Sequence, residues 1–133
     1  MTITGRCHCG EISYAGEAAP EHHAICHCTD CRTWSGAPMV GWMAFREESF
    51  TVTGTPARYR SSEHVVREFC GTCGTGLFYR NPAMLPGIVD VQSGTLDSPE
   101  AHAPGAQIMV KDRLPWADGI AALPAFQTYP DMD

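Results

Sequence analysis

The seven cysteines of this chain form three short clusters, and their spacing is typical of metal ligands. Three thiols lie within six residues, and two further pairs stand upstream and downstream of them. In chain order the clusters are Cys7 and Cys9, then Cys26, Cys28 and Cys31, then Cys70 and Cys73. Zinc takes four thiolate or imidazole ligands in a tetrahedron, and a structural site fills all four positions with protein. The two outer pairs supply four ligands and therefore predict a structural zinc site.

The central cluster supplies three ligands, which is one fewer than a closed site needs. A catalytic zinc ion usually has three protein ligands and leaves its fourth position to water or substrate. Three thiolates on Zn²⁺ give a net charge of about −1, so the metal generates hydroxide less readily than zinc on neutral histidines. Binding of a thiol is favoured instead, because zinc lowers the thiol pKa and holds the sulfur as a nucleophile for a carbonyl carbon. We therefore expect a catalytic zinc site at Cys26, Cys28 and Cys31, with a thiol and an aldehyde as substrates.

The spacing alone leaves other ligand sets open. A histidine could close the central cluster, and the candidates are His8, His27 and His64. His27 lies between two ligands on an extended backbone, so its side chain is expected to point away from a metal that those ligands share. The last two cysteines of the central cluster could instead combine with the downstream pair, or the thiols could be free and buried. A thioredoxin-like redox role for Cys70 and Cys73 is less favoured, because that motif opens a helix in a βαβ unit.

Charge and composition narrow the class of partner and the location. The formal net charge is −6, and only nine Lys and Arg residues are present, so a nucleic-acid partner is not expected. No stretch approaches the roughly 20 apolar residues of a membrane helix. Residues 1–5 lack the charged start and apolar run of a secretion signal, and clustered cysteines are typical of reducing compartments. We therefore expect a cytoplasmic protein without membrane association.

Short runs of β-branched and aromatic residues predict a mainly β fold with an antiparallel sheet. Glycine, proline and polar residues separate these runs, which lie around Ile12 and Tyr14 and at 22–26, 39–45, 50–53, 57–60, 65–69, 76–79, 88–91 and 107–110. The run at 39–45 is apolar almost throughout, which predicts a strand that is buried on both faces. A chain of 133 residues is most simply one domain, 1–133.

One or two short helical turns are expected beside the strands. One turn is predicted from Arg32 to Trp34, with Thr29 or Asp30 as its cap. About two further turns are predicted at 116–123, where a following proline ends the helix. Phe126 is then expected to pack onto the sheet.

Three motifs resemble the glutathione-dependent formaldehyde-activating enzyme family, whose domain also occurs in centromere protein V. They are GRCHCGEISY at 5–14, CHCTDCR at 26–32 followed by SGAP at 35–38, and FCGTCGT at 69–75. The tail segments DRLPW at 112–116 and LPAF at 123–126 are also similar. The resemblance covers nearly the whole chain.

The resemblance implies a small β-tent fold built around two zinc ions per chain. One ion would be bound by the outer four cysteines and the second by the central three, where the sulfur of glutathione would reach the metal. The implied activity joins glutathione to formaldehyde as S-hydroxymethylglutathione, which is a carbon-sulfur lyase reaction in reverse. This chain departs from the family pattern at Gln107, where members often have a histidine before an apolar strand.

Glutathione carries carboxylates, so cations and hydrogen-bond donors are expected beside the central cluster. Arg32, Ser35 and Gly36 are the nearest in sequence and are the predicted substrate-binding residues. Each also has a structural interpretation, because Arg32 can pair with an acidic neighbour and the other two can simply end the helical turn. The sequence thus favours a zinc enzyme of the carbon-sulfur lyase type that acts on glutathione and an aldehyde. The alternative is a zinc-stabilised binding module, and a homodimer is left open.

Overall fold

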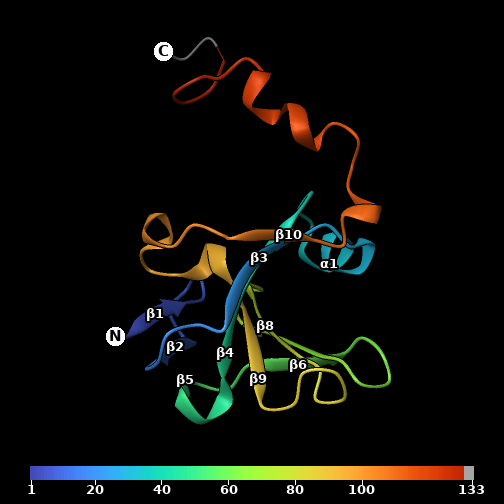
Figure 1. The fold of residues 1–133 in the computed structure, drawn as a ribbon. Coiled ribbons are helices and arrows are strands. Elements are labelled where there is room, and N and C mark those ends of the chain that lie inside the picture. Colours follow the sequence, from blue (N-terminus) through green and yellow to red (C-terminus); the bar gives the residue numbers. More distant parts are fainter. Residues whose placement is uncertain (131–133) are drawn as a thin grey trace.

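The computed structural model describes residues 1–130 and shows a mainly β protein with two sheets (Figure 1). Over these residues the large sheet has seven strands in the order β10-β3-β4-β9-β8-β7-β6, and the small sheet has three in the order β1-β2-β5. The mainly β prediction is therefore confirmed. The strands are β1 (Ile3–Arg6), β2 (Ser13–Gly16), β3 (His22–Cys26), β4 (Val40–Arg46), β5 (Phe50–Thr53), β6 (Ala57–Arg60), β7 (Val66–Phe69), β8 (Gly76–Arg80), β9 (Ile88–Gln92) and β10 (Ala106–Ile108).

Helices are few and short in the described part of the chain. The α-helix α1 spans Thr29–Ser35, and the 3₁₀ helices are η1 (Glu47–Ser49), η2 (Ser93–Thr95), η3 (Pro99–Ala101), η4 (Val110–Asp112) and η5 (Ala117–Ala122). The N-cap of α1 is Cys28, whose Sγ accepts a hydrogen bond from the backbone N of Cys31 at 3.3 Å. The prediction of Thr29 or Asp30 as the cap is wrong, because a sulfur acceptor takes the position that a side-chain oxygen usually fills.

One pairing departs from the antiparallel pattern. β10 runs parallel to β3, with Gln107 opposite Ile25, whereas the other named strand pairs among residues 1–130 are antiparallel. The sequence also does not predict β1, which is short and contains Gly5. Gly5 lies opposite Tyr14 of β2, and a Cβ there would be 2.1 Å from the Tyr14 hydroxyl oxygen. The glycine therefore allows the close approach that this pairing needs.

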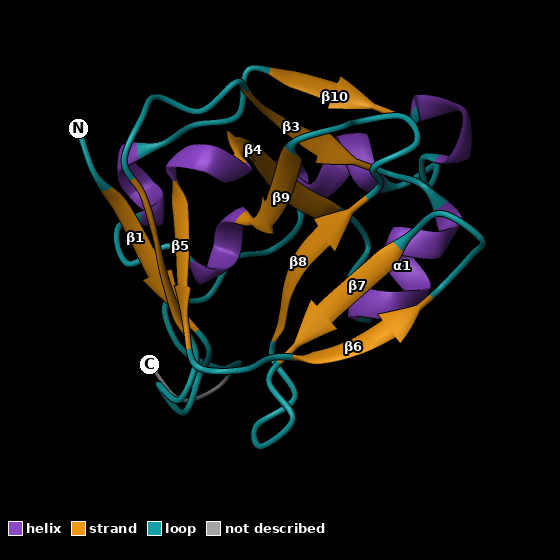
Figure 2. Ribbon diagram, turned by 90° about the horizontal axis from the view of Figure 1, so that it is seen from below, coloured by secondary structure: helices purple, strands orange, loops and turns teal. Residues whose placement is uncertain are grey.

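The main core lies between the two sheets, and Figure 2 shows β1 and β5 on one side of the molecule and β6, β7 and β8 on the other. Tyr14 and Phe50 of the small sheet stack with their ring centroids 5.5 Å apart. The ring of Phe78 from the large sheet packs edge-on against both, with its centroid 5.5 Å from that of Tyr14 and 5.6 Å from that of Phe50. A Cβ at Gly16 would lie 2.5 Å from the ring of Phe45, so this glycine makes room for a core aromatic.

The opposite face of the large sheet carries a second apolar cluster. Strand β4 contributes to both, because Met43 and Phe45 lie in the main core while Val40 and Trp42 lie in the second cluster. This confirms the prediction of a strand buried on both faces. The second cluster also contains two of the central thiols and packs against Trp34 of α1. The large sheet and α1 therefore hold the central cysteines between them.

Residues 113–130 leave the body of the molecule as a C-terminal arm (Figure 1). The chain changes direction at Met109, whose φ is 55°, and passes through η4 before the arm begins. Phe126 lies on this arm and is 52% exposed. The prediction that Phe126 packs onto the sheet is wrong, because the turn directs the segment away from it. No helix in residues 1–130 has the length and apolar character that crossing a membrane requires.

Asp90 is a buried carboxylate on β9 that should cost stability at neutral pH. It is 5% exposed, and its Oδ1 has no hydrogen-bond partner among the described residues. Burial raises the pKa of Asp90 to about 6. Ionisation on folding is therefore unfavourable, and this penalty grows as pH rises from the ordinary carboxyl pKa through the raised one.

We expect Asp90→Asn to raise the free energy of unfolding by about 2 kcal/mol at pH 7.5 and by about half as much at pH 5. Urea unfolding of both proteins at several pH values between these limits measures the difference. Glu48→Gln, at an exposed carboxylate of η1, is the matched control and should show no such pH-dependent gain. A gain for Asp90→Asn that is the same at both pH values would contradict the assignment.

Candidate metal centres

The outer four cysteines lie in two tight turns, one in each sheet. Cys7 and Cys9 follow β1, and Cys70 and Cys73 follow β7. Backbone amides point at the sulfurs: the N of Ile12 is 3.2 Å from Cys7 Sγ, and the N atoms of Thr72 and Cys73 are each 3.4 Å from Cys70 Sγ. Gly10 and Gly74 have φ values of 85° and 84°, which residues with side chains rarely adopt. Each turn is therefore shaped to present its sulfurs on one side.

The sulfur positions of this four-cysteine cluster fit one tetrahedral metal ion. Sulfur ligands at about 2.3 Å from such an ion lie about 3.8 Å from one another. Cys7 Sγ and Cys9 Sγ are 3.7 Å apart, and Cys9 Sγ and Cys70 Sγ are 3.8 Å apart. All four sulfurs lie within 4.8 Å of one another. The Thr75 hydroxyl, 3.2 Å from Cys73 Sγ, lowers the pKa of that thiol to about 5, which favours the thiolate form that metals bind.

The central three cysteines meet where β3 ends and α1 begins. Cys26 is the last residue of β3, Cys28 caps α1, and Cys31 lies in its first turn. Their sulfurs lie within 4.8 Å of one another, and Cys26 Sγ is 3.9 Å from Cys31 Sγ. This spacing also fits three corners of a metal tetrahedron. No other cysteine, histidine or carboxylate of residues 1–130 belongs to this group.

None of the three histidines considered as a fourth ligand belongs to this group. His27 is 1% exposed, and its Nε2 is 2.8 Å from Oε1 of Gln107 on β10. His64 Nε2 lies 3.7 Å from a carboxylate oxygen of Glu63, and His8 is an exposed residue of the first turn. The structure therefore leaves the central cluster with three side-chain sulfurs, and it groups the downstream pair with the upstream one.

Arg67 is a residue of this centre that the sequence analysis does not identify. It lies on β7, is 4% exposed, and places Nη1 and Nη2 at 3.8 and 3.9 Å from Cys31 Sγ. Its Cζ is 5.4 Å from the ring centroid of Trp34 and 5.1 Å from that of Tyr79, so the guanidinium makes cation–π contacts with both rings. The available signal was an arginine in a predicted strand, three residues before the turn that begins at Cys70.

The protons of the central thiols are distributed unequally. The pKa of Cys31 is lowered to about 5, first by the hydrogen bond from Cys26 and then by Cys28 and Arg67. The same bond raises the pKa of Cys26, and burial raises it further. Cys31 is therefore the thiolate of the group, and the buried guanidinium lies against it.

The predicted substrate-binding residues lie around α1. Nη1 of Arg32 donates to the backbone oxygen of His27 at 3.0 Å and also to the backbone oxygen of Asp112. Ser35 Oγ donates to the backbone oxygen of Cys31 at 2.6 Å, and Gly36 ends α1 with φ of 68°. Ser35 also lines a pocket of about 330 Å³ beside α1, whose walls include Trp34, Gly74, Thr75, Gly76, Gln92 and Thr95. Contact of these residues with a substrate stays a prediction.

Comparisons with known proteins agree with this fold. The crystal structure of a Rhodobacter sphaeroides protein is similar, with a TM-score of 0.63 at 20% sequence identity, and the match covers 78% of this chain and 98% of that one. An uncharacterized lyase of Schizosaccharomyces pombe is 29% identical over 75 residues, which make up 56% of this chain and 55% of that protein. The chain thus spans about half the length of this relative.

The region that matches a protein family includes both candidate metal centres. The sequence model of the glutathione-dependent formaldehyde-activating enzyme matches residues 2–112. This region includes all seven cysteines and Arg67, and it ends just before the C-terminal arm. The motif resemblance noted in the sequence is therefore confirmed over most of the chain. The chain belongs to the glutathione-dependent formaldehyde-activating enzyme family.

Proposed function

We propose that this protein is a zinc-dependent enzyme of the carbon-sulfur lyase type that acts on the adduct of glutathione and formaldehyde. The observation that carries the proposal is the geometry of the central cluster, in which three sulfurs converge and no fourth side chain of a ligand type joins them among residues 1–130. An ion held there keeps one position for an incoming sulfur. Membership in the family supports glutathione as the thiol and formaldehyde as the aldehyde.

In this proposal the two clusters have different tasks. The four outer cysteines hold a structural zinc ion, and Cys26, Cys28 and Cys31 hold the second one. Zinc bound at the central cluster lowers the pKa of a thiol and keeps its sulfur as a thiolate. The glutathione sulfur forms a bond to the formaldehyde carbon, the carbonyl electron pair moves to oxygen, and that oxygen takes a proton from water. The lyase direction breaks the same carbon-sulfur bond and returns the proton.

The surroundings of the central cluster suit the rest of the tripeptide. The pocket beside α1 is lined by Ser35, Gly74 and Thr75, and the space over Gly74 is open, so an extended peptide backbone can approach the protein closely there. We propose that Ser35 and Gly36 contact the glutathione backbone, with the Ser35 hydroxyl oxygen as the acceptor, because its proton is donated to the backbone oxygen of Cys31. Arg32 adds a positive charge to α1, and its Nη1 is already bound to two carbonyl oxygens.

The direct test mixes glutathione with formaldehyde and follows adduct formation by NMR, with and without the zinc-loaded protein. We expect the protein to shorten the time to equilibrium without changing the final adduct concentration, since a catalyst alters only the rate. Equal rates with and without protein would remove this activity and leave the zinc-stabilised binding module as the function.

Cys28→Ser should abolish the acceleration while the fold is retained. Serine is a good N-cap residue, so α1 should still form, but the central cluster loses one of three ligands. We expect zinc content to fall from about two ions to about one per chain, with an unchanged circular dichroism spectrum. Cys73→Ser is the matched variant at the other cluster and should lower the free energy of unfolding by several kcal/mol. Full activity of Cys28→Ser would contradict the assignment.

A further inference from the structure

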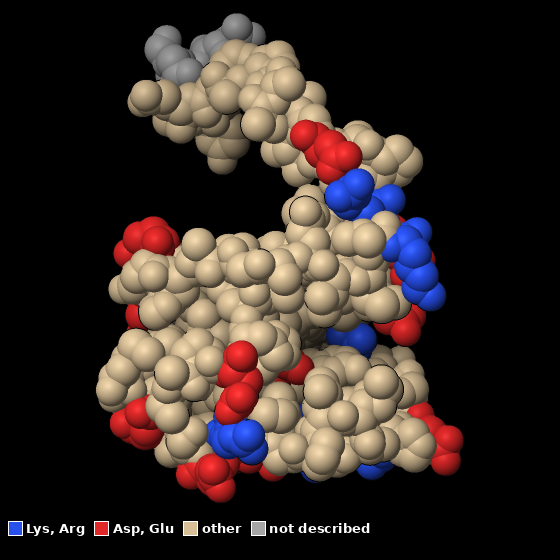
Figure 3. Space-filling view, in the orientation of Figure 1, with Lys and Arg blue, Asp and Glu red and all other residues tan. Residues whose placement is uncertain are grey.

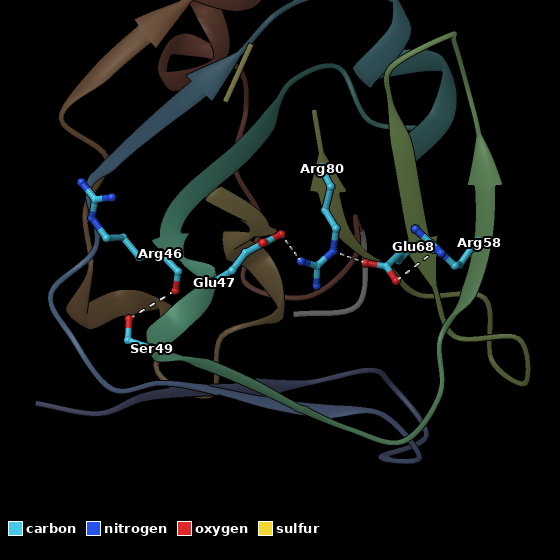
Figure 4. Close-up of polar contacts among 6 residues, drawn as sticks. All are labelled: Arg46, Glu47, Ser49, Arg58, Glu68 and Arg80. Carbon is cyan, nitrogen blue, oxygen red and sulfur yellow. Dashed lines mark hydrogen bonds and ion pairs between the residues drawn. The ribbon is translucent and has the colours of Figure 1, made fainter. Parts of the chain in front are cut away.

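Arg67 is a buried cation without a carboxylate partner among residues 1–130, unlike Arg58 and Arg80 on the neighbouring strands. Figure 4 shows Arg80 between Glu47 and Glu68, at 2.6 Å from each, and Arg58 at 3.8 Å from Glu68. Arg67 forms no ion pair with a carboxylate of residues 1–130, although it is 4% exposed. A guanidinium removed from water needs a compensating anion. The anion that it meets is the sulfur of Cys31.

The position of this guanidinium is fixed by contacts on several sides. Trp34 and Tyr79 cover it at 5.4 and 5.1 Å, and its Nε is 3.2 Å from Ser61 Oγ. Both Nη atoms are directed to Cys31 Sγ. Arginine keeps its charge at any pH at which the protein folds. The central cluster therefore has a permanent positive charge beside it in addition to any metal that it holds.

Charge decides what the open position can accept. Three thiolates on a divalent ion carry about −1, and a fourth thiolate would bring the centre to about −2. With a buried guanidinium in contact, the same centre has a total of about −1 when the fourth thiolate is bound. We propose that Arg67 is a positioning residue whose charge lets the central cluster accept an anionic sulfur as its fourth ligand. This inference rests on the metal-binding role proposed above for the central cysteines.

The test uses full-length protein loaded with Co²⁺, whose sulfur-to-metal absorption reports each thiolate that binds. Glutathione is titrated into the wild type, Arg67→Gln and Arg67→Lys. We expect Arg67→Gln to weaken glutathione binding about tenfold or more, as loss of a unit charge at short range implies, and Arg67→Lys to restore most of it. Arg58→Gln removes a charge from the adjacent strand and should bind as the wild type does.

A neutral ligand separates the charge effect from a structural one. Imidazole brings no charge, so Arg67→Gln should bind it with unchanged affinity, whereas loss of the Trp34 and Tyr79 contacts would weaken both ligands together. Equal glutathione affinity of the wild type and Arg67→Gln, or parallel weakening of both ligands, would overturn the inference. Thiol binding without acceleration of adduct formation would overturn the proposed activity but leave the role of Arg67 intact.

A second inference concerns the C-terminal arm and the sheet edge beside it. Eight of the eleven exposed large hydrophobic residues of the described chain lie at 108–129. These eight, which we call the apolar strip, are Ile108, Met109, Val110, Trp116, Ile120, Leu123, Phe126 and Tyr129. In Figure 3 the arm carries charged side chains at its base and is uncharged beyond it. Backbone hydrogen bonds of η5 and its flanks are local, such as Gly119 N to Trp116 O.

The strip is continuous with an open sheet edge. β10 is the edge strand of the large sheet, and all three of its residues are exposed. Open edges pair with further strands. Each residue of the apolar strip exposes 41–67% of its surface. Together the eight residues expose about 800 Å², which is the area that each partner buries in a protein–protein interface of standard size. We propose that a second copy of this chain docks here, with its β10 antiparallel to this β10 and each arm lying on the other copy.

Sedimentation velocity at micromolar concentration tests this docking. We expect the wild type to be a dimer, and we expect the double variant Trp116→Ala with Phe126→Ala to be a folded monomer. Tyr59→Ala with Met84→Ala removes exposed hydrophobic residues outside the strip and should remain dimeric. A monomeric wild type, or a dimer that the first double variant leaves intact, would overturn this inference.

Discussion

The two sheets of this protein meet at the four sulfur atoms of the outer cysteines. Cys7 and Cys9 leave the small sheet, Cys70 and Cys73 leave the large one, and the spacing of their sulfurs is that of ligands around a single ion. Thiolates at such distances repel one another unless a cation lies between them. A metal ion held here would link Cys9 to Cys70, which is 61 positions later in the chain, and would fix the position of β7. The central cluster would depend on this constraint, because β7 places Arg67 against Cys31.

The two clusters share one sulfur geometry but differ in what completes them. At the outer cluster a fourth cysteine closes the tetrahedron, whereas at the central one the adjacent histidine is held by Gln107 and turned away. In place of a fourth ligand the centre has a buried cation in contact with Cys31. A site with three thiolates and a neighbouring positive charge binds another anion more readily than either feature alone would allow. This difference supports the proposal that the outer cluster has a structural task and the central one a chemical task.

The sequence predicts those features that short-range spacing determines. The grouping of the cysteines, the doubly buried strand at β4 and the orientation of His27 follow from residue type and alternation. The contact of Arg67 with Cys31 does not, because it depends on the pairing of β7 with β8 and on the placement of α1 over the sheet. The parallel pairing of β10 is also non-local, since it joins residues 106–108 to β3, about 80 positions earlier in the chain. The direction of the arm follows from a turn at Met109 that no residue pattern predicts.

X-ray absorption at the zinc edge tests the central claim most directly, because it counts sulfur neighbours per ion. In protein with both sites filled, one closed four-sulfur site and one open three-sulfur site give an average of about 3.5 sulfurs. Saturation with glutathione should raise this average to about 4. An average of 4 before glutathione is added, with no change afterwards, would show that a protein ligand already fills the central site and would contradict the account.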